Sequence, residues 1–327
     1  MMRILVIDGG DFVAQRLLGA LAACDWAEPV AAQHGNFGGR GQPLPAPPGV
    51  RTLALDVTDA VAVGAALDGI DAVVSCIASD PATISFGALA LFAAAARCAA
   101  PPRVVHLSSM AVYGSATGAV DESAPLRGDL GPYSQAKVAA EGCAAAYPRS
   151  VILRPGVDYG PGSELWSGRI GRWLQARRIG DLGAAGDGPC NLVHGDDVVA
   201  AVLQCLQRPG VEGQVFNLGS PQPPTWNEYL VRYGRALGAV PVRRIAASRL
   251  RFEARVLAPP LKIVELAARK AGIDPRGLPA PIPPSLLSLL VQDIRLVVRR
   301  AERELGLQWK PLATGLAETA QWLRGTQ

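Results

Sequence analysis

Tyr133 and Lys137 are the residues whose types and spacing most directly suggest chemistry in this chain. They stand four positions apart in a segment that begins with Pro132 and continues with good helix formers, so both side chains project from one helical face. A phenol has a pKa of about 10, and a neighbouring ammonium group favours the phenolate. The pair is therefore typical of a proton-transfer centre, although an amphipathic tyrosine beside a snorkelling lysine gives the same spacing.

Ser109 adds a hydroxyl group at the end of an apolar run, residues 104–108, which we expect to form a central strand. Ligands of open α/β sheets bind outside the carboxyl ends of the strands. A second apolar run, residues 152–155, leads into a tight turn that ends near residue 162. Ser109 therefore stands where a substrate oxygen could be held opposite Tyr133.

The elements that must position these groups follow an alternating pattern. Apolar, β-rich runs cover residues 3–7, 29–33, 51–54, 71–77 and 103–108, and helical patterns cover 12–23, 60–67 and 85–99. This alternation predicts an α/β fold, a Rossmann-like doubly wound parallel sheet with helices on both faces. The Gly- and Pro-rich stretch 35–49 is expected to be a long loop.

The second half of the chain is less regular, with prolines clustered at 221–224, 258–260 and 279–284. A strand at 214–218 and a helix at 226–237 are still recognisable. We therefore predict a domain over residues 1–155, with later strands from 190–220 returning to it, and a smaller C-terminal lobe over 156–327.

Composition excludes several classes of protein. The 327 residues are 49% hydrophobic and 18% charged, with a net charge of +4, and the dispersed basic residues do not suggest a nucleic-acid partner. The six cysteines include no CxxC pair, so we expect no metal and free thiols in a reducing cytoplasm. No apolar run reaches the roughly 18 residues that span a bilayer, and the N-terminus lacks a signal-peptide layout. We expect a soluble, cytoplasmic protein with no membrane partner.

Taken together, these segments resemble the extended short-chain dehydrogenase/reductases, the NAD-dependent epimerase/dehydratase family. Further matching segments are 193–198 (VHGDDV), 215–219 (VFNLG) and 300–306 (RAERELG), in the same order, while 240–292 is the least recognisable part. The resemblance implies that Tyr133 is the catalytic acid/base and that Ser109 orients the substrate oxygen. Lys137 would hold the nicotinamide ribose and lower the pKa of the tyrosine.

The resemblance also implies NAD or NADP as cofactor, bound by the first domain, and a small-molecule substrate bound by the C-terminal lobe. A carboxylate at the end of the second strand would favour NAD, but His34 and Arg40 are available there to a 2′-phosphate, which leans slightly towards NADP. The expected cofactor contacts are Gly9, Gly10, Asp11, Phe12, Val13, His34, Asp56, Val57, Ala78, Tyr133, Lys137, Pro155 and Val157.

The phosphate loop departs from the family pattern. The family has Gly-x-x-Gly-x-x-Gly after the first strand, and here Asp8, Asp11 and Ala14 occupy the three glycine positions. A carboxylate there adds bulk and, at about 4 Å from a phosphate charge, costs roughly 1 kcal/mol in water and several in a drier site. Asp11 could instead cap the following helix.

Two functional interpretations remain open. The first is an NAD(P)-dependent oxidoreductase or epimerase/dehydratase that transfers hydride at a carbinol or carbonyl carbon. The second, favoured by Asp8 and Asp11, is a non-catalytic relative that senses a ligand or binds a partner. The resemblance further suggests a homodimer through helices 85–99 and 133–146.

Substrate signals are few. Many nucleotide-sugar enzymes of the family place Asn where this chain has Val157, which weakens a sugar-nucleotide interpretation. The apolar stretch 256–290 suits a lipophilic substrate, a buried helical surface or a dimer contact. Arg154 is expected to pair with a carboxylate of the second lobe, and a lone His194 is more often structural than functional.

Overall fold

The computed structural model describes residues 1–8, 11–33, 46–78, 80–273 and 278–326. At its centre lies a seven-stranded parallel sheet with the strand order β10-β7-β5-β4-β1-β2-β3. The strands are β1 (Met2–Ile7), β2 (Ala27–Gln33), β3 (Arg51–Ala54), β4 (Ala72–Ser75), β5 (Arg103–Leu107), β7 (Ser150–Pro155) and β10 (Val215–Leu218). The order reverses on either side of β1, which confirms the predicted Rossmann-like, doubly wound class.

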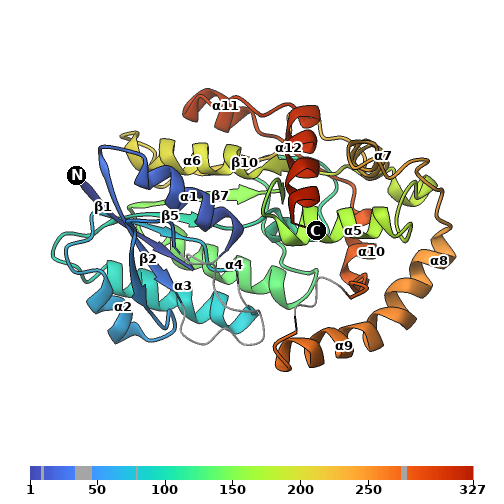
Figure 1. Cartoon of the computed structure of the whole chain (residues 1–327). Helices are drawn as coiled ribbons and strands as arrows, with labels where there is room; N and C mark the ends of the chain where they lie inside the picture. Colours follow the sequence, from blue (N-terminus) through green and yellow to red (C-terminus); the bar gives the residue numbers. More distant parts are fainter. Residues whose placement is uncertain (9–10, 34–45, 79, 274–277, 327) are drawn as a thin grey trace.

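Helices cover both faces of this sheet, as Figure 1 shows. One face carries α1 (Phe12–Ala22), α6 (Gly195–Gln207) and α11 (Arg299–Leu305), and the other carries α2 (Ala60–Ala66), α3 (Pro81–Ala95) and α4 (Pro132–Ala145). The five strands from β10 to β1 are almost wholly buried, which explains why they read as continuous apolar runs, whereas the edge strand β3 is largely exposed.

Helix α3 begins earlier and ends earlier than the predicted 85–99. Its start is fixed by Asp80, whose carboxylate accepts hydrogen bonds from the backbone N–H groups of Ala82 (3.0 Å) and Thr83 (3.1 Å). Pro81 occupies the first helical position, where its missing N–H costs nothing. The Asp-Pro signal was in the sequence and outweighs the apolar pattern that begins further on.

The rest of the chain forms a second hydrophobic core around Trp173, Trp226, Tyr229 and Tyr233. Its elements are β8 (Val157–Tyr159), β9 (Leu192–His194), α5 (Arg169–Gln175), α7 (Trp226–Ala236), α8 (Ala247–Phe252), α9 (Ala258–Lys270), α10 (Pro284–Leu290) and α12 (Leu312–Gly325). Strand β6 (Gly118–Val120) pairs with β11 (Ile294–Leu296), so the two halves of the chain share a small sheet. Among the described helices, none is both long and apolar enough to cross a membrane.

Candidate active site

The predicted site residues gather at one edge of the central sheet. Strands β7, β5, β4 and β1 are neighbours and run in the same direction, so their carboxyl ends lie side by side. Asp8 directly follows β1, Ala78 comes after β4, Ser109 comes after β5 and Pro155 ends β7. This is the edge at which open α/β sheets bind their ligands.

Helix α4 delivers Tyr133 and Lys137 to this edge. Lys137 is only 1% exposed, and its Nζ donates hydrogen bonds to the carbonyl oxygens of Ile77 (2.9 Å) and Leu107 (3.0 Å), where β4 and β5 end. Tyr133 is 41% exposed, and the centre of its ring lies 5.9 Å from the Lys137 Nζ. The lysine therefore fixes the helix to the sheet from below, while the tyrosine remains accessible to a substrate.

Ser109 is brought to the same place through a short helical turn, Met110–Tyr113. Its Oγ accepts a hydrogen bond from the backbone N–H of Ala111 (3.2 Å). Ser134, the residue after Tyr133, donates from Oγ to the carbonyl of Ala111 (2.7 Å). One residue thus ties the serine turn to the first turn of α4, and this holds the three predicted catalytic residues in one region.

Burial controls the charge of Lys137. Removal from solvent lowers the pKa of its ammonium group to about 8, and the nearby Asp11, Cys76, Glu141 and Asp8 counter part of that effect. A pKa of about 8 leaves the group mostly protonated at neutral pH, so a positive charge lies beneath Tyr133.

Asp158 is a titratable residue of this site that sequence reasoning missed. Burial, and then the repulsion of Asp11, raise the pKa of its carboxyl to about 8, which makes it a proton donor near neutral pH. It lies on β8, two residues after the turn that ends β7. No spacing signal marked it, because its environment is set by β1, α1 and α4, which are far away in sequence.

Asp8 and Asp11 are joined across the turn between β1 and α1 by a hydrogen bond from the backbone N–H of Asp11 to the carbonyl oxygen of Asp8 (3.0 Å). Asp8 has a φ of 63°, in the left-handed region that glycine favours and that aspartate tolerates better than most residues. Its Oδ2 accepts from the backbone N–H of Ala78 (3.4 Å), which directs the carboxylate towards β4. Ala14, at the third glycine position, is fully buried against the sheet. Gly9 and Gly10 lie outside the described residues.

Asp11 occupies the N-cap position of α1 with extended backbone angles. Its side chain nevertheless makes no capping hydrogen bond to that helix, so the capping role considered from the sequence is not observed. The carboxylate acts instead on the electrostatics of the site, where it has the largest effect of any charged group on the pKa of both Lys137 and Asp158.

The other expected cofactor contacts divide into core and surface positions. Val13, Val57 and Val157 are each 4% exposed or less and pack in hydrophobic cores. Phe12 is partly buried, with its ring against the backbone of Gly162 and Gly195. Asp56 lies outside these cores. It is exposed after β3, where its carboxylate accepts hydrogen bonds from the N–H (2.9 Å) and hydroxyl (2.7 Å) of Thr58. His34 falls outside the described residues.

The expectation for Arg154 was wrong. It pairs with Glu141 of α4 rather than with a carboxylate of the second lobe. The reason is topological: β7 lies next to β5 in the sheet, directly beneath the helix that carries Glu141.

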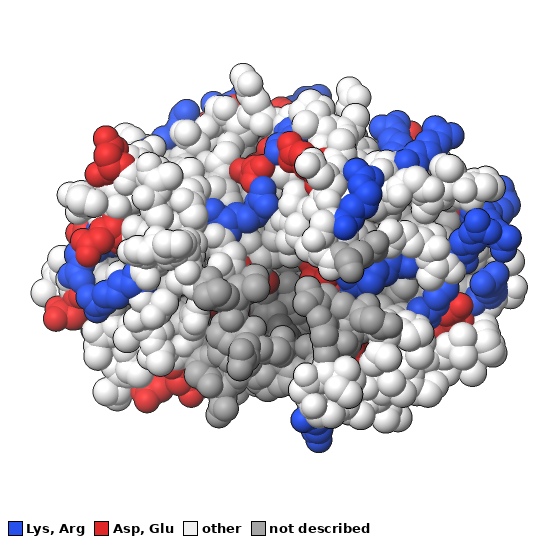
Figure 2. Space-filling view, in the orientation of Figure 1, with Lys and Arg blue, Asp and Glu red and all other residues white. Residues whose placement is uncertain are grey.

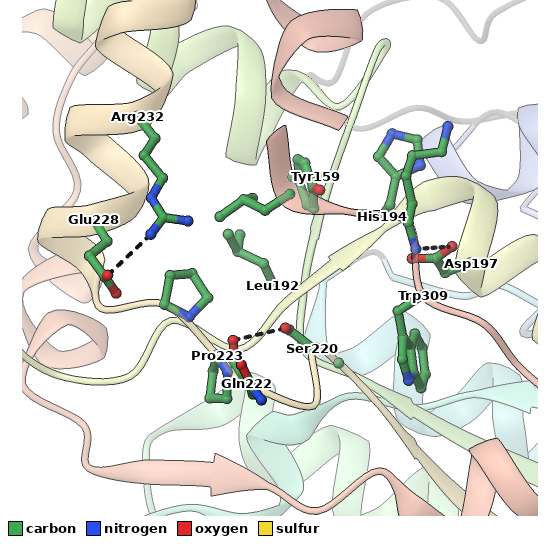
Figure 3. A pocket seen from close by; sticks show the side chains of 14 residues that line it. Tyr159, Leu192, His194, Asp197, Ser220, Gln222, Pro223, Glu228, Arg232 and Trp309 are labelled. Carbon is green, nitrogen blue, oxygen red and sulfur yellow. Dashed lines mark hydrogen bonds and ion pairs between the residues drawn. The ribbon is translucent and has the colours of Figure 1, made fainter. Parts of the chain in front are cut away.

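A separate cavity of about 290 Å³ lies at the carboxyl ends of β9 and β10, and none of the predicted catalytic residues lines it. In Figure 3 its walls are formed by side chains that include Tyr159, His194, Asp197, Arg232 and Trp309. The buried His194 accepts at Nδ1 from the N–H of Asp196 (3.2 Å), and burial lowers its pKa to about 4. This neutral, helix-capping imidazole agrees with the structural interpretation of His194.

A doubly wound parallel sheet with an accessible tyrosine over a buried lysine at its carboxyl edge defines a Rossmann-like protein of the dinucleotide-binding class. A model of the NAD dependent epimerase/dehydratase family matches residues 12–219, and the chain belongs to that family.

Individual relatives agree with this assignment. The chain is 31% identical over 251 residues to 2′-dehydrokanamycin reductase of Streptomyces kanamyceticus, a match that covers 72% of this chain and 67% of that enzyme. Among solved structures, MoeE5 in complex with UDP-glucose and NAD is 22% identical with a TM-score of 0.72, over 99% of both chains. The dTDP-glucose 4,6-dehydratase of Bacillus anthracis, in complex with NAD, is 18% identical with a TM-score of 0.75, over 100% of this chain and 98% of that one. At these identities the structural likeness shows the fold alone.

Proposed function

We propose that this protein is an NAD(P)-dependent oxidoreductase that moves hydride at a carbinol or carbonyl carbon, with Tyr133 as its acid/base. The observation that carries the proposal is the pairing of an accessible Tyr133 with a buried, charged Lys137 at 5.9 Å. Family membership supports it, as does the similarity to a reductase.

In this proposal the nicotinamide supplies or accepts the hydride, and the residues of the chain manage the accompanying proton. Tyr133 gives the proton to the substrate oxygen during reduction and takes it back during oxidation. Lys137 stabilises the ionised phenol through its charge, since it is fixed by two carbonyl groups and cannot move away. Ser109 holds the substrate oxygen within reach of the phenol.

The first turn differs from the family pattern in charge, through Asp8 and Asp11. The left-handed Asp8 preserves the tight turn, and the buried Ala14 preserves the packing of α1 on the sheet. Asp11 adds a negative charge where the pyrophosphate would approach the helix N-terminus. We therefore propose that NAD(P) binds with its pyrophosphate displaced from Asp11, over residues 1–155, and that the lobe over 156–327 binds the substrate. The slight lean towards NADP stays a prediction.

For the substrate we propose a ketone or secondary alcohol on a sugar-like ring. The similarity to 2′-dehydrokanamycin reductase supports a ring without a nucleotide, and Val157, buried in the second core, offers no polar group to a sugar nucleotide. Purified protein should be assayed for NADH and NADPH oxidation with an amino-sugar ketone such as 2′-dehydrokanamycin and for turnover of UDP-glucose. Turnover that Tyr133→Phe abolishes is the expected result, and full activity of that variant would overturn the assignment.

The alternative is a non-catalytic, ligand-sensing relative, and the carboxylates of Asp8 and Asp11 favour it. Titration with NADH and NADPH, followed by thermal shift, separates the two. Saturable binding of either dinucleotide supports the enzyme, whereas no binding of either at millimolar concentration favours the alternative.

We further propose a cytoplasmic homodimer that pairs α3 and α4 of each copy. Phe86 and Leu89 support this, because they stand on α3 with exposures of 60% and 57% although both are large apolar side chains. The paired substitution of Phe86 and Leu89 by Glu should convert a dimer to a monomer in sedimentation velocity, and an unchanged mass would contradict the proposed interface.

A further inference from the structure

The larger apolar side chains of helix α9 are exposed to solvent rather than buried against the protein. The side that packs on the protein carries Ala258, Glu265 and Ala268, at intervals of seven and three residues. Ile263 and Leu266, which project from other sides of the helix, are 68% and 42% exposed. A helix in a globular domain normally shows the opposite distribution.

The exposed apolar surface extends beyond α9 at both ends. Phe252 and Val256 precede the helix with exposures of 52% and 54%, and Ile273 follows it with 60%. With Ile263, Val264 and Leu266 they make six of the fifteen exposed large apolar residues of the described chain, within 22 consecutive positions. We call this surface the α8–α9 face. Such a concentration marks an interaction surface rather than ordinary scatter.

The charges of the α8–α9 face are all of one sign. Between residues 249 and 273 the exposed charged side chains of the described residues are basic: Arg249, Arg251, Arg255, Lys262 and Lys270. The two acidic residues of that stretch, Glu253 and Glu265, are buried. Glu253 pairs with Arg178, and Glu265 pairs with Arg169 and also with Lys262 (3.2 Å), so one basic group of the face is partly balanced by a carboxylate beneath it. Figure 2 shows basic side chains gathered on the right of the molecule, near α8, while the surface over α9 at the lower right is largely uncharged.

We propose that the α8–α9 face docks on the surface of an anionic lipid bilayer. Aliphatic side chains flanked by Lys and Arg match the two zones of such a surface, the acyl boundary and the phosphate layer. A second copy of the chain would place like charges against each other, which opposes self-association here. A nucleic acid would offer phosphates to the basic groups but nothing to the aliphatic ones.

This proposal departs from the sequence-based expectation of no membrane partner, which rested on the lack of a spanning run. Surface docking needs no such run. It needs an amphipathic surface and charge. The exposed apolar side chains of α9 can be recognised only once the structure shows which side of the helix is buried.

Vesicle sedimentation with the full chain tests the proposal. We expect binding to vesicles of equal parts phosphatidylglycerol and phosphatidylcholine, at least about tenfold stronger than to pure phosphatidylcholine, and weakened by 0.5 M salt to below about one tenth because the charges are screened. The paired substitution Lys262→Glu and Lys270→Glu should lower the affinity by at least about tenfold. Ile263→Ser with Leu266→Ser should lower it at constant charge.

The matched control is Arg51→Glu with Arg97→Glu, which changes the net charge equally at exposed positions of the other domain. It should leave vesicle binding within about twofold, and thermal melts should show that all variants are folded. An equal loss of vesicle affinity in the control and in the α9 variants would show that only the net charge of the protein matters, and it would overturn the proposal. It also fails if the wild type ignores anionic vesicles, or if Ile263→Ser with Leu266→Ser dissociates a dimer in sedimentation velocity, because the face would then be a self-interface.

Discussion

The guanidinium group of Arg154 contacts both carboxylate oxygens of Glu141, through Nε at 3.0 and 3.1 Å and through Nη2 at 2.7 Å. Glu141 stands one helical turn beyond Lys137 on α4, and Ser108, the neighbour of Ser109, also donates to its carboxylate. Arg154 continues the network by donating from Nη1 to the hydroxyl of Tyr113 (2.8 Å). The helix with the proposed acid/base is therefore fixed to β5 and β7 by buried charges.

Removing one partner of this pair should destabilise the protein strongly. Glu141→Ala leaves the buried guanidinium without its counter-charge, and we expect the free energy of unfolding in urea to fall by about 3–5 kcal/mol. Arg232→Ala is the matched control, since it removes an exposed ion pair with Glu228 and should cost less than about 1 kcal/mol. Similar decreases in the free energy of unfolding of the two variants would show that the buried Glu141–Arg154 pair contributes no more to stability than an exposed pair.

Tyr133→Phe should abolish turnover without unfolding the protein. Loss of an acid/base group lowers kcat by about 10²–10⁴-fold, while a side chain that is 41% exposed contributes little packing. Tyr147→Phe is the control, because Tyr147 donates its hydroxyl hydrogen bond to Pro102 in a core (2.6 Å) and takes no part in the site. Steady-state rates and thermal melts of both variants check the prediction, and comparable rate losses would argue against a role for Tyr133 in proton transfer.

Asp11→Asn should tighten dinucleotide binding. The substitution removes the negative charge that displaces the pyrophosphate in our proposal, so the phosphates can approach the helix N-terminus. A like charge at about 4 Å costs roughly 1 kcal/mol even in water, or about fivefold in Kd. Fluorescence titration with NADH and NADPH measures the change, and Asp68→Asn, at an exposed site after α2, controls for net charge. An unchanged Kd would mean that Asp11 does not repel the pyrophosphate, which contradicts the prediction.

The depressed pKa of Lys137 predicts a pH dependence of stability. With a pKa of about 8 in the folded chain and 10.5 as its ordinary value, the unfolded chain binds more protons between those limits. Burial of the charged Lys137 lowers the free energy of unfolding at neutral pH. That free energy should therefore increase as the pH rises from about 8 to 10.5, by up to about 3 kcal/mol. Urea unfolding of the wild type and of Lys137→Met across this range isolates the effect, and parallel pH profiles would contradict it.

The sequence was informative where the signal was local. Apolar runs located the strands of the sheet, and the four-residue spacing placed Tyr133 and Lys137 on one helical face. The sequence allowed no reliable prediction where a residue's environment depends on contacts between segments that are far apart in the chain. The raised pKa of Asp158 depends on Asp11, and the partner of Arg154 depends on the order of strands. The left-handed φ of Asp8, at a position where the family has glycine, could not be predicted from the residue type either.

The burial of Lys137 gives the protein a built-in chemical reporter. The chain contains only four lysines, of which Lys262 and Lys270 are exposed and Lys310 is partly covered. Amine-reactive reagents will modify the exposed pair at once, whereas Lys137, held between the ends of β4 and β5, can react only when α4 lifts from the sheet. The labelling rate at that single position would measure how often the catalytic edge opens, and a dinucleotide that rests on it would slow the reaction.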